Sequence, residues 1–140
     1  MILSFLLLMT DPVPAQQADC DEPLTQAAMN ICSMSEFERA DADMNSAWQD
    51  ARSWAKEQDD AFEYDDAQPG FWPTLLDGQR AWLKFRDNHC RLVSYDARGG
   101  SLQPTLANSC FTDMTTARTH QLRDLLTNQV SGQPNQVPEE

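Results

Sequence analysis

TQAAMNICSMSEFERADADMNSAWQDARSWAKEQD, residues 25–59, contains neither Gly nor Pro. Its apolar residues recur every three or four positions, which is the spacing of one face of an α-helix. This apolar stripe consists of Met29, Cys32, Phe37, Ala40, Met44, Ala47, Ala51 and Trp54. Thr25 can cap the start of the helix, although Ser33-x-x-Glu36 is a capping box from which it could begin instead. The pattern predicts one long amphipathic helix that ends at about Asp59.

Two shorter helices are expected to follow. Pro73 can open the second, because a first-turn residue needs no N–H, and this helix should end near Tyr95. Gly78 inside it is unfavourable by about 1 kcal/mol relative to Ala. The shared face of the second helix contains Leu75, Leu76, Gln79, Trp82, Leu83, Arg86 and Cys90. Pro104 can open the third helix, and the stripe of that helix contains Leu106, Cys110, Met114, Ala117, Leu122 and Leu125.

The expected fold is all-α, with three main antiparallel helices in one domain over residues 16–126. No stretch alternates apolar and polar residues as a half-buried strand does. Residues 58–72 should form an acidic connection that Pro69-Gly70 breaks, with room for a loose helical turn. Residues 127–140 form a polar tail that we expect to be disordered, because they cannot bury enough apolar area.

Composition bounds the class of protein. The 140 residues correspond to one domain, and the formal net charge is -12. That charge argues against nucleic acid as a partner, because a nucleic-acid binder must neutralise phosphates. The mean hydropathy of -0.57 excludes a protein with several membrane spans.

The N-terminus is typical of a secretory signal peptide. Residues 2–9 form an apolar run that is too short to span a bilayer. Val13-Pro14-Ala15 supplies small residues for cleavage after Ala15, with Ala18 as the second choice, although no Lys or Arg precedes the run. A buried N-terminal helix is the alternative interpretation. We expect residues 1–15 to be removed and the protein to reach the bacterial periplasm or the exterior, without stable membrane insertion.

Four cysteines agree with export: Cys20, Cys32, Cys90 and Cys110. An even number behind a signal peptide indicates two disulfides, and four cysteines allow three pairings. Cys20–Cys32 with Cys90–Cys110 closes two short loops and is the preferred pairing. The spacings lack the close ligand pairs of a zinc site, so no metal and no cofactor are expected.

Other candidate sites have structural interpretations that we prefer. Asp41-x-Asp43-x-Asn45 begins like a calcium loop, but Ser46 and Arg52 stand where Gly and Glu are required. His89 and His120 are the only histidines, and the sequence contains no nucleophile-elbow motif. We therefore expect that the protein is not an enzyme. Five polar residues fall on or beside the apolar stripes and are expected to satisfy one another inside the bundle: Asp41, Asn45, Gln79, Arg86 and Arg118.

Two segments are candidates for binding a protein partner. The first is the acidic run Asp59, Asp60, Glu63, Asp65 and Asp66, because charge of one sign steers a partner of the other. The second is Arg98, Gly99, Gly100 and Ser101, a loop that leads into a helix N-terminus. A solvated connection and a plain turn, respectively, are the alternatives.

Ordered motifs across the chain resemble one known family. Cys20, Thr25-Gln-x-x-Met-Asn-x-Cys32 and Ala40-Asp41-x-x-Met44-Asn45 come first. They are followed by Gln79-Arg-Ala-Trp82-Leu-x-Phe-Arg86-Asp87-x-x-Cys90, Gly99-Gly100-Ser101, Cys110 and Thr116-x-Arg118-x-x-x-Leu122. This order is similar to the LprI-like lysozyme-inhibitor family. Departures are Met44, where the family usually has Leu, together with Gly78 and the acidity of residues 58–69.

The resemblance implies a small exported helical domain that inhibits lysozyme. A cationic lysozyme would be attracted by the acidic chain, and the loop at Arg98 would then occlude the cleft that holds the two catalytic carboxylates. The alternative function is an envelope interaction module that binds another periplasmic or secreted protein. The oligomeric state is open.

Overall fold

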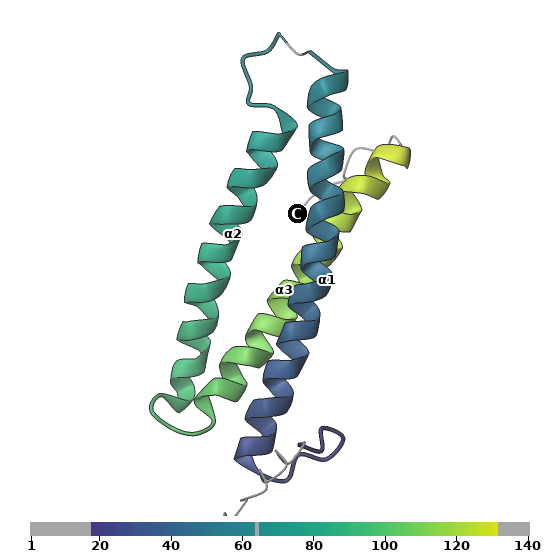
Figure 1. Cartoon of the computed structure of the whole chain (residues 1–140). Helices are drawn as coiled ribbons and strands as arrows, with labels where there is room; N and C mark the ends of the chain where they lie inside the picture. The colour runs from purple at the N-terminus through teal and green to yellow at the C-terminus, as the bar shows by residue number, and fades with distance from the viewer. Residues whose placement is uncertain (1–17, 64, 132–140) are drawn as a thin grey trace, which may run out of the picture.

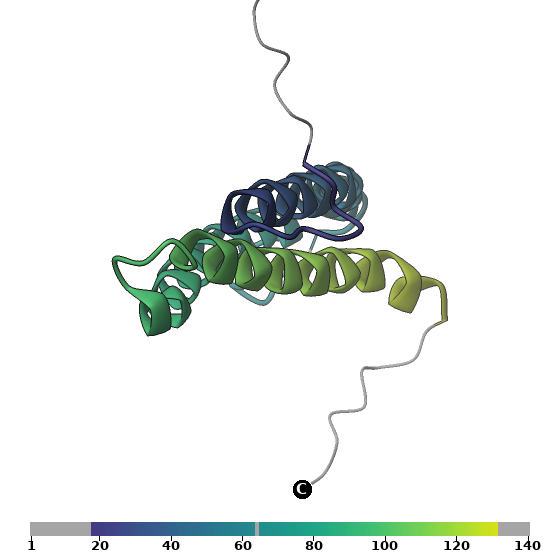
Figure 2. The same ribbon diagram turned by 90° about the horizontal axis from the view of Figure 1, so that it is seen from below.

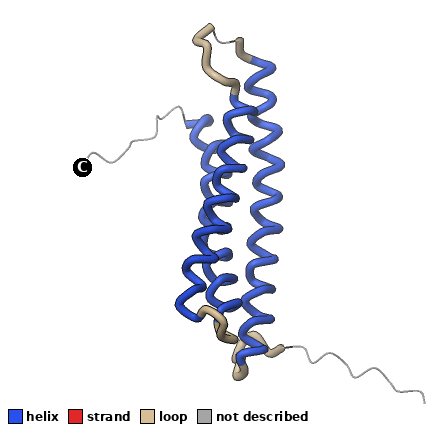
Figure 3. Tube along the Cα trace, turned by 90° about the vertical axis from the view of Figure 1, so that its left-hand side faces the viewer, coloured by secondary structure: helices blue, strands red, loops and turns tan. Residues whose placement is uncertain are grey.

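Three helices form an elongated bundle in the computed structural model, which describes residues 18–63 and 65–131. They are α1 (Gln26–Ala61), α2 (Phe71–Val93) and α3 (Gln103–Ser131), with a 3-10 turn η1 (Ser94–Ala97) after α2. Successive helices run in opposite directions (Figure 1), and the side view contains only helices and loops in the described residues (Figure 3). The predicted all-α class with three antiparallel helices is therefore confirmed.

The helices are not equally close along their length. The most extensive contact is between α1 and α3. In Figure 1, α3 starts beside the end of α2, passes behind α1 and emerges beyond it, and Figure 2 shows this crossing from below. The α1–α2 connection lies at one end of the bundle and the α2–α3 connection at the other.

Small side chains on α1 make the core thin. Ala47, Ala51 and Ala55 are at most 1% exposed. Met44, Ala47, Ala51 and Leu122 form the buried cluster, against which Trp48, Leu75, Trp82 and Leu125 pack. Alanine at these positions lets neighbouring helices approach closely, because no larger side chain holds the backbones apart. The apolar stripe predicted on α1 is buried or half-buried throughout.

The buried face of α3 differs from its predicted stripe. Ala117 is exposed, whereas Asn108, Thr115 and Thr119 are at most 5% exposed together with Leu122. The Thr119 hydroxyl donates to the Thr115 carbonyl of its own helix at 3.0 Å, whereas Asn108 donates to Ser33 of α1 and the Thr115 hydroxyl accepts from Arg86 of α2. A search for apolar residues alone overlooks such positions, because a hydroxyl bonded to its own helix can be buried at little cost.

The first connection is shorter than predicted because α1 continues to Ala61 and α2 begins at Phe71. Thr25 caps α1 through a 3.1 Å bond from the Ala28 amide, so the alternative start at Ser33 is wrong. Asp59 accepts hydrogen bonds from the amides of Phe71 at 2.6 Å and Trp72. These bonds satisfy two first-turn N–H groups, and α2 therefore starts two residues before Pro73.

The two ends of the chain lie partly outside the described residues. The polar tail was expected from Thr127, but α3 continues to Ser131, so that boundary is too early. The remainder of the predicted tail, residues 132–140, lies outside the described residues, as does the predicted signal peptide. None of the described helices combines the length and apolar composition that a bilayer-spanning segment requires.

The two disulfides join the predicted partners. Cys20–Cys32 ties the segment before α1 to that helix, with the Cα atoms 5.5 Å apart. Cys90–Cys110 links the last turn of α2 to α3, with the Cα atoms 5.4 Å apart. Both disulfides lie near the α2–α3 end of the bundle, and each reduces the conformational entropy of the unfolded chain.

Ala51→Leu should lower the free energy of unfolding by about 1–3 kcal/mol, because a larger side chain overpacks a fully buried site. Ala42→Leu on the exposed face of α1 is the matched control and should leave stability within about 0.5 kcal/mol. Urea denaturation followed by circular dichroism measures both. Equal stability of the two variants would contradict close approach at Ala51.

Asp59→Ala should destabilise the protein by about 1–2 kcal/mol, because the first turn of α2 loses both of its side-chain acceptors. Asp60→Ala, at the exposed neighbouring position, removes the same charge without a cap. A thermal melt of the two variants separates the effects. The cap would be unimportant if both variants melted together.

Candidate partner-binding surfaces

Arg86 is the most interconnected polar residue of the bundle. Its side chain is 10% exposed, and its Nε and Nη2 donate to Asp87 Oδ1 at 3.0 and 2.9 Å. Nη1 donates to Thr115 Oγ1 at 3.3 Å and lies 3.7 Å from Asp41 Oδ1. One guanidinium from α2 is thus bonded to α2 and α3 and paired with α1. A planar group with several donors suits this position better than a lysine ammonium.

Aromatic rings surround the same guanidinium. Its central carbon lies 5.5 Å from the centroids of Phe37 and Phe111 and 5.1 Å from that of Trp82. Phe37 and Phe111 also contact each other, with centroids 5.1 Å apart. These rings favour the buried cation through their quadrupoles and exclude water from it. Arg86 therefore acts as a structural link between the helices.

The other predicted network residues are brought together in part. Arg118 Nε donates to Gln79 Oε1 at 2.8 Å, and Asn45 donates to Asp41 Oδ2 at 3.0 Å. Trp82 stands between the two groups, because Arg86 and Arg118 both lie near its ring. Burial lowers the pKa of Arg118 from its ordinary value, yet a guanidinium remains charged at neutral pH.

The 98–101 loop, consisting of Arg98, Gly99, Gly100 and Ser101, is held firmly at the α2–α3 end. Gly99 has a φ of +78°, a conformation that glycine adopts without strain. Its amide donates to Gln103 Oε1 at 2.9 Å, while the Ser101 carbonyl accepts from Asn30 on α1 at 3.1 Å. Arg98 itself is exposed. The loop is therefore a braced projection with an accessible cation.

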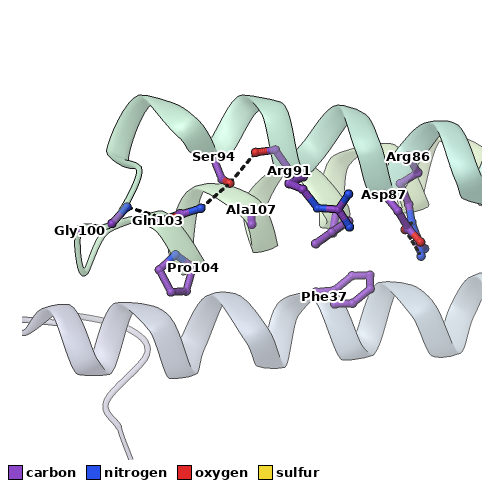
Figure 4. A pocket seen from close by; sticks show the side chains of 11 residues that line it. Phe37, Arg86, Asp87, Arg91, Ser94, Gly100, Gln103, Pro104 and Ala107 are labelled. Atoms are coloured by element: carbon purple, nitrogen blue, oxygen red, sulfur yellow. Dashed lines mark hydrogen bonds and ion pairs between the residues drawn. The ribbon is translucent and has the colours of Figure 1, made fainter.

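A cavity of about 680 Å³ lies beneath this loop. Figure 4 shows Phe37 and Pro104 on one side and Arg91, Ser94 and Gln103 facing them. Gln103 donates to Ser94 Oγ, which in turn donates to the Arg91 carbonyl at 2.7 Å. These bonds connect the loop to the last turn of α2. The polar side chains of Ser94 and Gln103 in the cavity lining are thus hydrogen-bonded within the protein, and they support the loop.

Arg98 also packs on its own neighbour. Its guanidinium carbon lies 4.6 Å from the centroid of the Tyr95 ring in η1. Tyr95 is 37% exposed, so the stacked pair forms part of the surface. Stacking restricts the side chain of Arg98 and thereby reduces the entropy lost when it contacts a partner.

The predicted acidic residues lie at the opposite end. Asp60, Glu63, Asp65 and Asp66 are exposed, whereas Asp59 is half-buried as the cap of α2. A cavity of about 990 Å³ adjoins them. The 23 residues of α2 separate this end from the 98–101 loop by about 34 Å at the usual helical rise. The two predicted partner-binding segments therefore do not form one surface.

The remaining sequence candidates lie elsewhere on the bundle. His89 is exposed and stacks on Phe85 with centroids 5.5 Å apart, and His120 is exposed on α3. Asp41, Asp43 and Asn45 lie within the continuous α1 helix. Across residues 18–63 and 65–131, no three His, Cys, Asp or Glu side chains are grouped so that they could hold a metal ion.

Some important residues were missed by the sequence analysis. Asn30 joins Ser101 and Thr105 to α1, and Ser33 accepts from Asn108 at 3.1 Å. Their signal was the presence of amide and hydroxyl side chains beside buried stripe positions. Nothing in the spacing indicated which of these residues would face one another across two helices.

Comparison with known proteins gives the family. The protein-family model described as "Lysozyme inhibitor LprI" matches residues 18–122, which include all four cysteines and the Arg86 cluster. The chain therefore belongs to the LprI lysozyme-inhibitor family. It is similar to "Uncharacterized protein R02472" of Rhizobium meliloti (strain 1021), with 35% identity over 127 residues, 89% of this chain and 91% of the relative. No solved structure matches the chain.

Arg86→Met should destabilise the protein by about 1–3 kcal/mol, because the buried Thr115 and the partly exposed Asp41 and Asp87 lose their shared donor. Arg80→Met removes the same charge from an exposed i,i+3 pair on α2 and should change stability by less than about 0.5 kcal/mol. Urea denaturation provides both values. Similar losses would show that the charge, rather than the buried contacts, matters.

Proposed function

We propose that the protein inhibits a cationic lysozyme by placing the 98–101 loop in its active-site cleft. Membership of the lysozyme-inhibitor family over residues 18–122 is the observation that carries this proposal. The geometry supports it, because the loop projects at the end of a bundle and is braced by Asn30 and Gln103. A preorganised projection loses little entropy on entering a cleft.

The charges of the protein also support insertion of the 98–101 loop into the cleft of a cationic lysozyme. Lysozyme cleaves glycans with two carboxyl groups in its cleft, and the exposed guanidinium of Arg98 can pair with a carboxylate there. The net charge of -12 attracts a cationic enzyme over longer distances. The acidic connection contributes to this attraction but lies about 34 Å from the 98–101 loop, which places it away from the part of the chain that enters the cleft.

The proposed setting is the bacterial periplasm or the exterior of the cell. Two closed disulfides are typical of oxidising compartments, and residues 1–15 have the composition of a signal peptide. An inhibitor in this location would meet lysozyme before the enzyme reached the cell wall. Its role is binding, with no turnover of its own.

Arg98→Ala should weaken lysozyme inhibition by about tenfold or more, because a charge-assisted hydrogen bond contributes about 1.5–3 kcal/mol. The measurement is a cell-wall lysis assay with the oxidised, exported protein and a cationic lysozyme at two salt concentrations. Arg80→Ala, which removes an exposed arginine from the middle of the chain's α2 helix, is the charge-matched control and should inhibit like the wild type.

Two results of this assay would contradict the proposal. Equal inhibition by both arginine variants would exclude insertion of the 98–101 loop. Absence of saturable inhibition by the wild type would exclude lysozyme as the target and favour the alternative function, an envelope module that binds another exported protein. A pull-down from the periplasm would then identify that protein.

A further inference from the structure

We propose that the end of the bundle opposite the 98–101 loop carries a second docking site, for a basic segment of a partner protein with an apolar anchor. The site is the cavity of about 990 Å³ beside the acidic connection, here called the acidic-end groove. Its apolar lining includes Trp54, Phe71, Leu75 and Leu125, its acidic lining includes Glu63 and Asp66, and the exposed Gly78 also lines it.

The path of the helices explains why a groove exists at this end. α3 crosses behind α1 and moves away from α2 as it approaches the acidic connection (Figure 1). Leu75 from α2 and Leu125 from α3 both line the space between them. At the other end, Cys90–Cys110 holds α2 and α3 together. The bundle is therefore tied at one end and hollowed at the other.

Gly78 is the strongest indication that the groove has an occupant. It lies inside α2, where glycine is the least favourable residue after proline. A Cβ at this position would meet no atom within 4 Å, and its backbone has no positive φ that would require glycine. The fold therefore does not need glycine here. Its effect is to leave this part of the groove lining open to an apolar side chain from outside.

The walls offer an apolar surface of defined shape. The rings of Trp54 and Phe71 meet edge to face, with centroids 5.6 Å apart and planes at 88°. This contact fixes both rings as part of the groove wall. Phe62 also lines the groove and is 52% exposed. Aromatic and aliphatic walls suit a single leucine-sized or aromatic anchor.

The rim sets the charge of the partner. Residues 57–66 contain six acidic residues and no Lys or Arg. Within the described part of the chain, Glu63 and Asp66 form no ion pair. The nearby cations Arg52 and Lys56 lie over the Trp72 ring, at 5.6 and 5.2 Å from its centroid. Asp66 Oδ1 accepts from the Gln68 amide at 3.0 Å, and the other carboxylate oxygens of Glu63 and Asp66 can pair with lysine or arginine side chains of a partner.

Charge also argues against two other possible occupants of the groove, a second copy of the chain and residues 132–140. A second copy of this chain carries the same net charge of -12 and the same acidic rim, so it is repelled. Residues 132–140 contain two glutamates and no basic residue. Arg118, which also lines the groove, donates to Gln79 and Gln121 and marks the side away from the partner's cations. A basic segment of another protein is the occupant that fits.

The site is independent of lysozyme inhibition. Gly78, the groove residue of α2 nearest the 98–101 loop, lies 15 residues or about 22 Å before the end of α2 at Val93, so both ends can be occupied at once. Failure of the inhibitor proposal leaves this one standing, and the reverse is also true.

The test uses the full oxidised protein and a fluorescein-labelled peptide of alternating lysine and leucine. Fluorescence anisotropy should show saturable binding that is lost when the peptide lysines become glutamate or its leucines become serine. Gly78→Leu should fill this part of the groove and weaken binding by about tenfold. Gly78→Ala has the same backbone effect with a smaller side chain and should bind within about twofold of the wild type.

A charge-matched pair of variants tests the rim. Glu63→Gln with Asp66→Asn should weaken binding by about tenfold at low salt and by less at high salt. Glu36→Gln with Glu38→Gln removes the same charge from an exposed part of α1 far along the chain and should have little effect. Thermal melts check that all variants fold, and Gly78→Ala should fold like the wild type because a Cβ at this position would meet no atom within 4 Å.

Several outcomes would overturn the proposal. Unchanged binding by Gly78→Leu would mean that the groove is not used. Equal losses in the two carboxylate pairs would reduce the effect to general attraction. Equal binding of the serine-containing peptide would remove the apolar anchor. Sedimentation that shows a dimer lost in Gly78→Leu would assign the groove to a second copy. If Gly78→Leu failed to fold, the rim variants would decide.

Discussion

The guanidinium of Arg86 is the interaction on which the arrangement of the helices depends. It leaves α2, bonds to Thr115 of α3, pairs with Asp41 of α1 and is enclosed by three aromatic rings. A cation buried to this degree is destabilising when its partners are missing, because it then lacks compensation for the water it has lost. It therefore specifies how the three helices align. The small residues of α1 complement it, since they allow close approach but leave little apolar area to define a unique alignment by themselves.

The two ends of the bundle differ in how closely the helices are held together. Near Arg86, the Cys90–Cys110 disulfide and the bonds of Gln103 and Asn30 hold the α2–α3 end in one conformation. At the other end the helices are joined by the Asp59 cap, and α3 moves away from α2. The braced end presents a projection with a cation, and the open end presents a hollow with acidic residues. These complementary shapes favour different partners.

Sequence reasoning reached most of the fold because the responsible signals are local. Spacing of apolar residues located α1, and the short loops that they close favoured, among three possible pairings, the two disulfides that the structure contains. The start of α2 was misplaced because Asp59 caps it from another helix. The buried face of α3 was misjudged at Ala117 because threonine and asparagine replace apolar residues there. Arg86 and Asp41 were expected in one polar network, but their aromatic enclosure depends on how helices cross, which no local spacing encodes. The separation of the two candidate surfaces likewise follows from topology alone.

Hydrogen–deuterium exchange of the oxidised protein, with and without a cationic lysozyme, tests this division of the bundle most directly. Amides of the 98–101 loop and the first turn of α3 should become protected on complex formation, while those of residues 59–71 should exchange as in the free protein. Protection confined to residues 59–71 would place lysozyme at the acidic end and contradict the assignment. Unchanged exchange at both ends, at concentrations that give inhibition, would contradict contact by either surface.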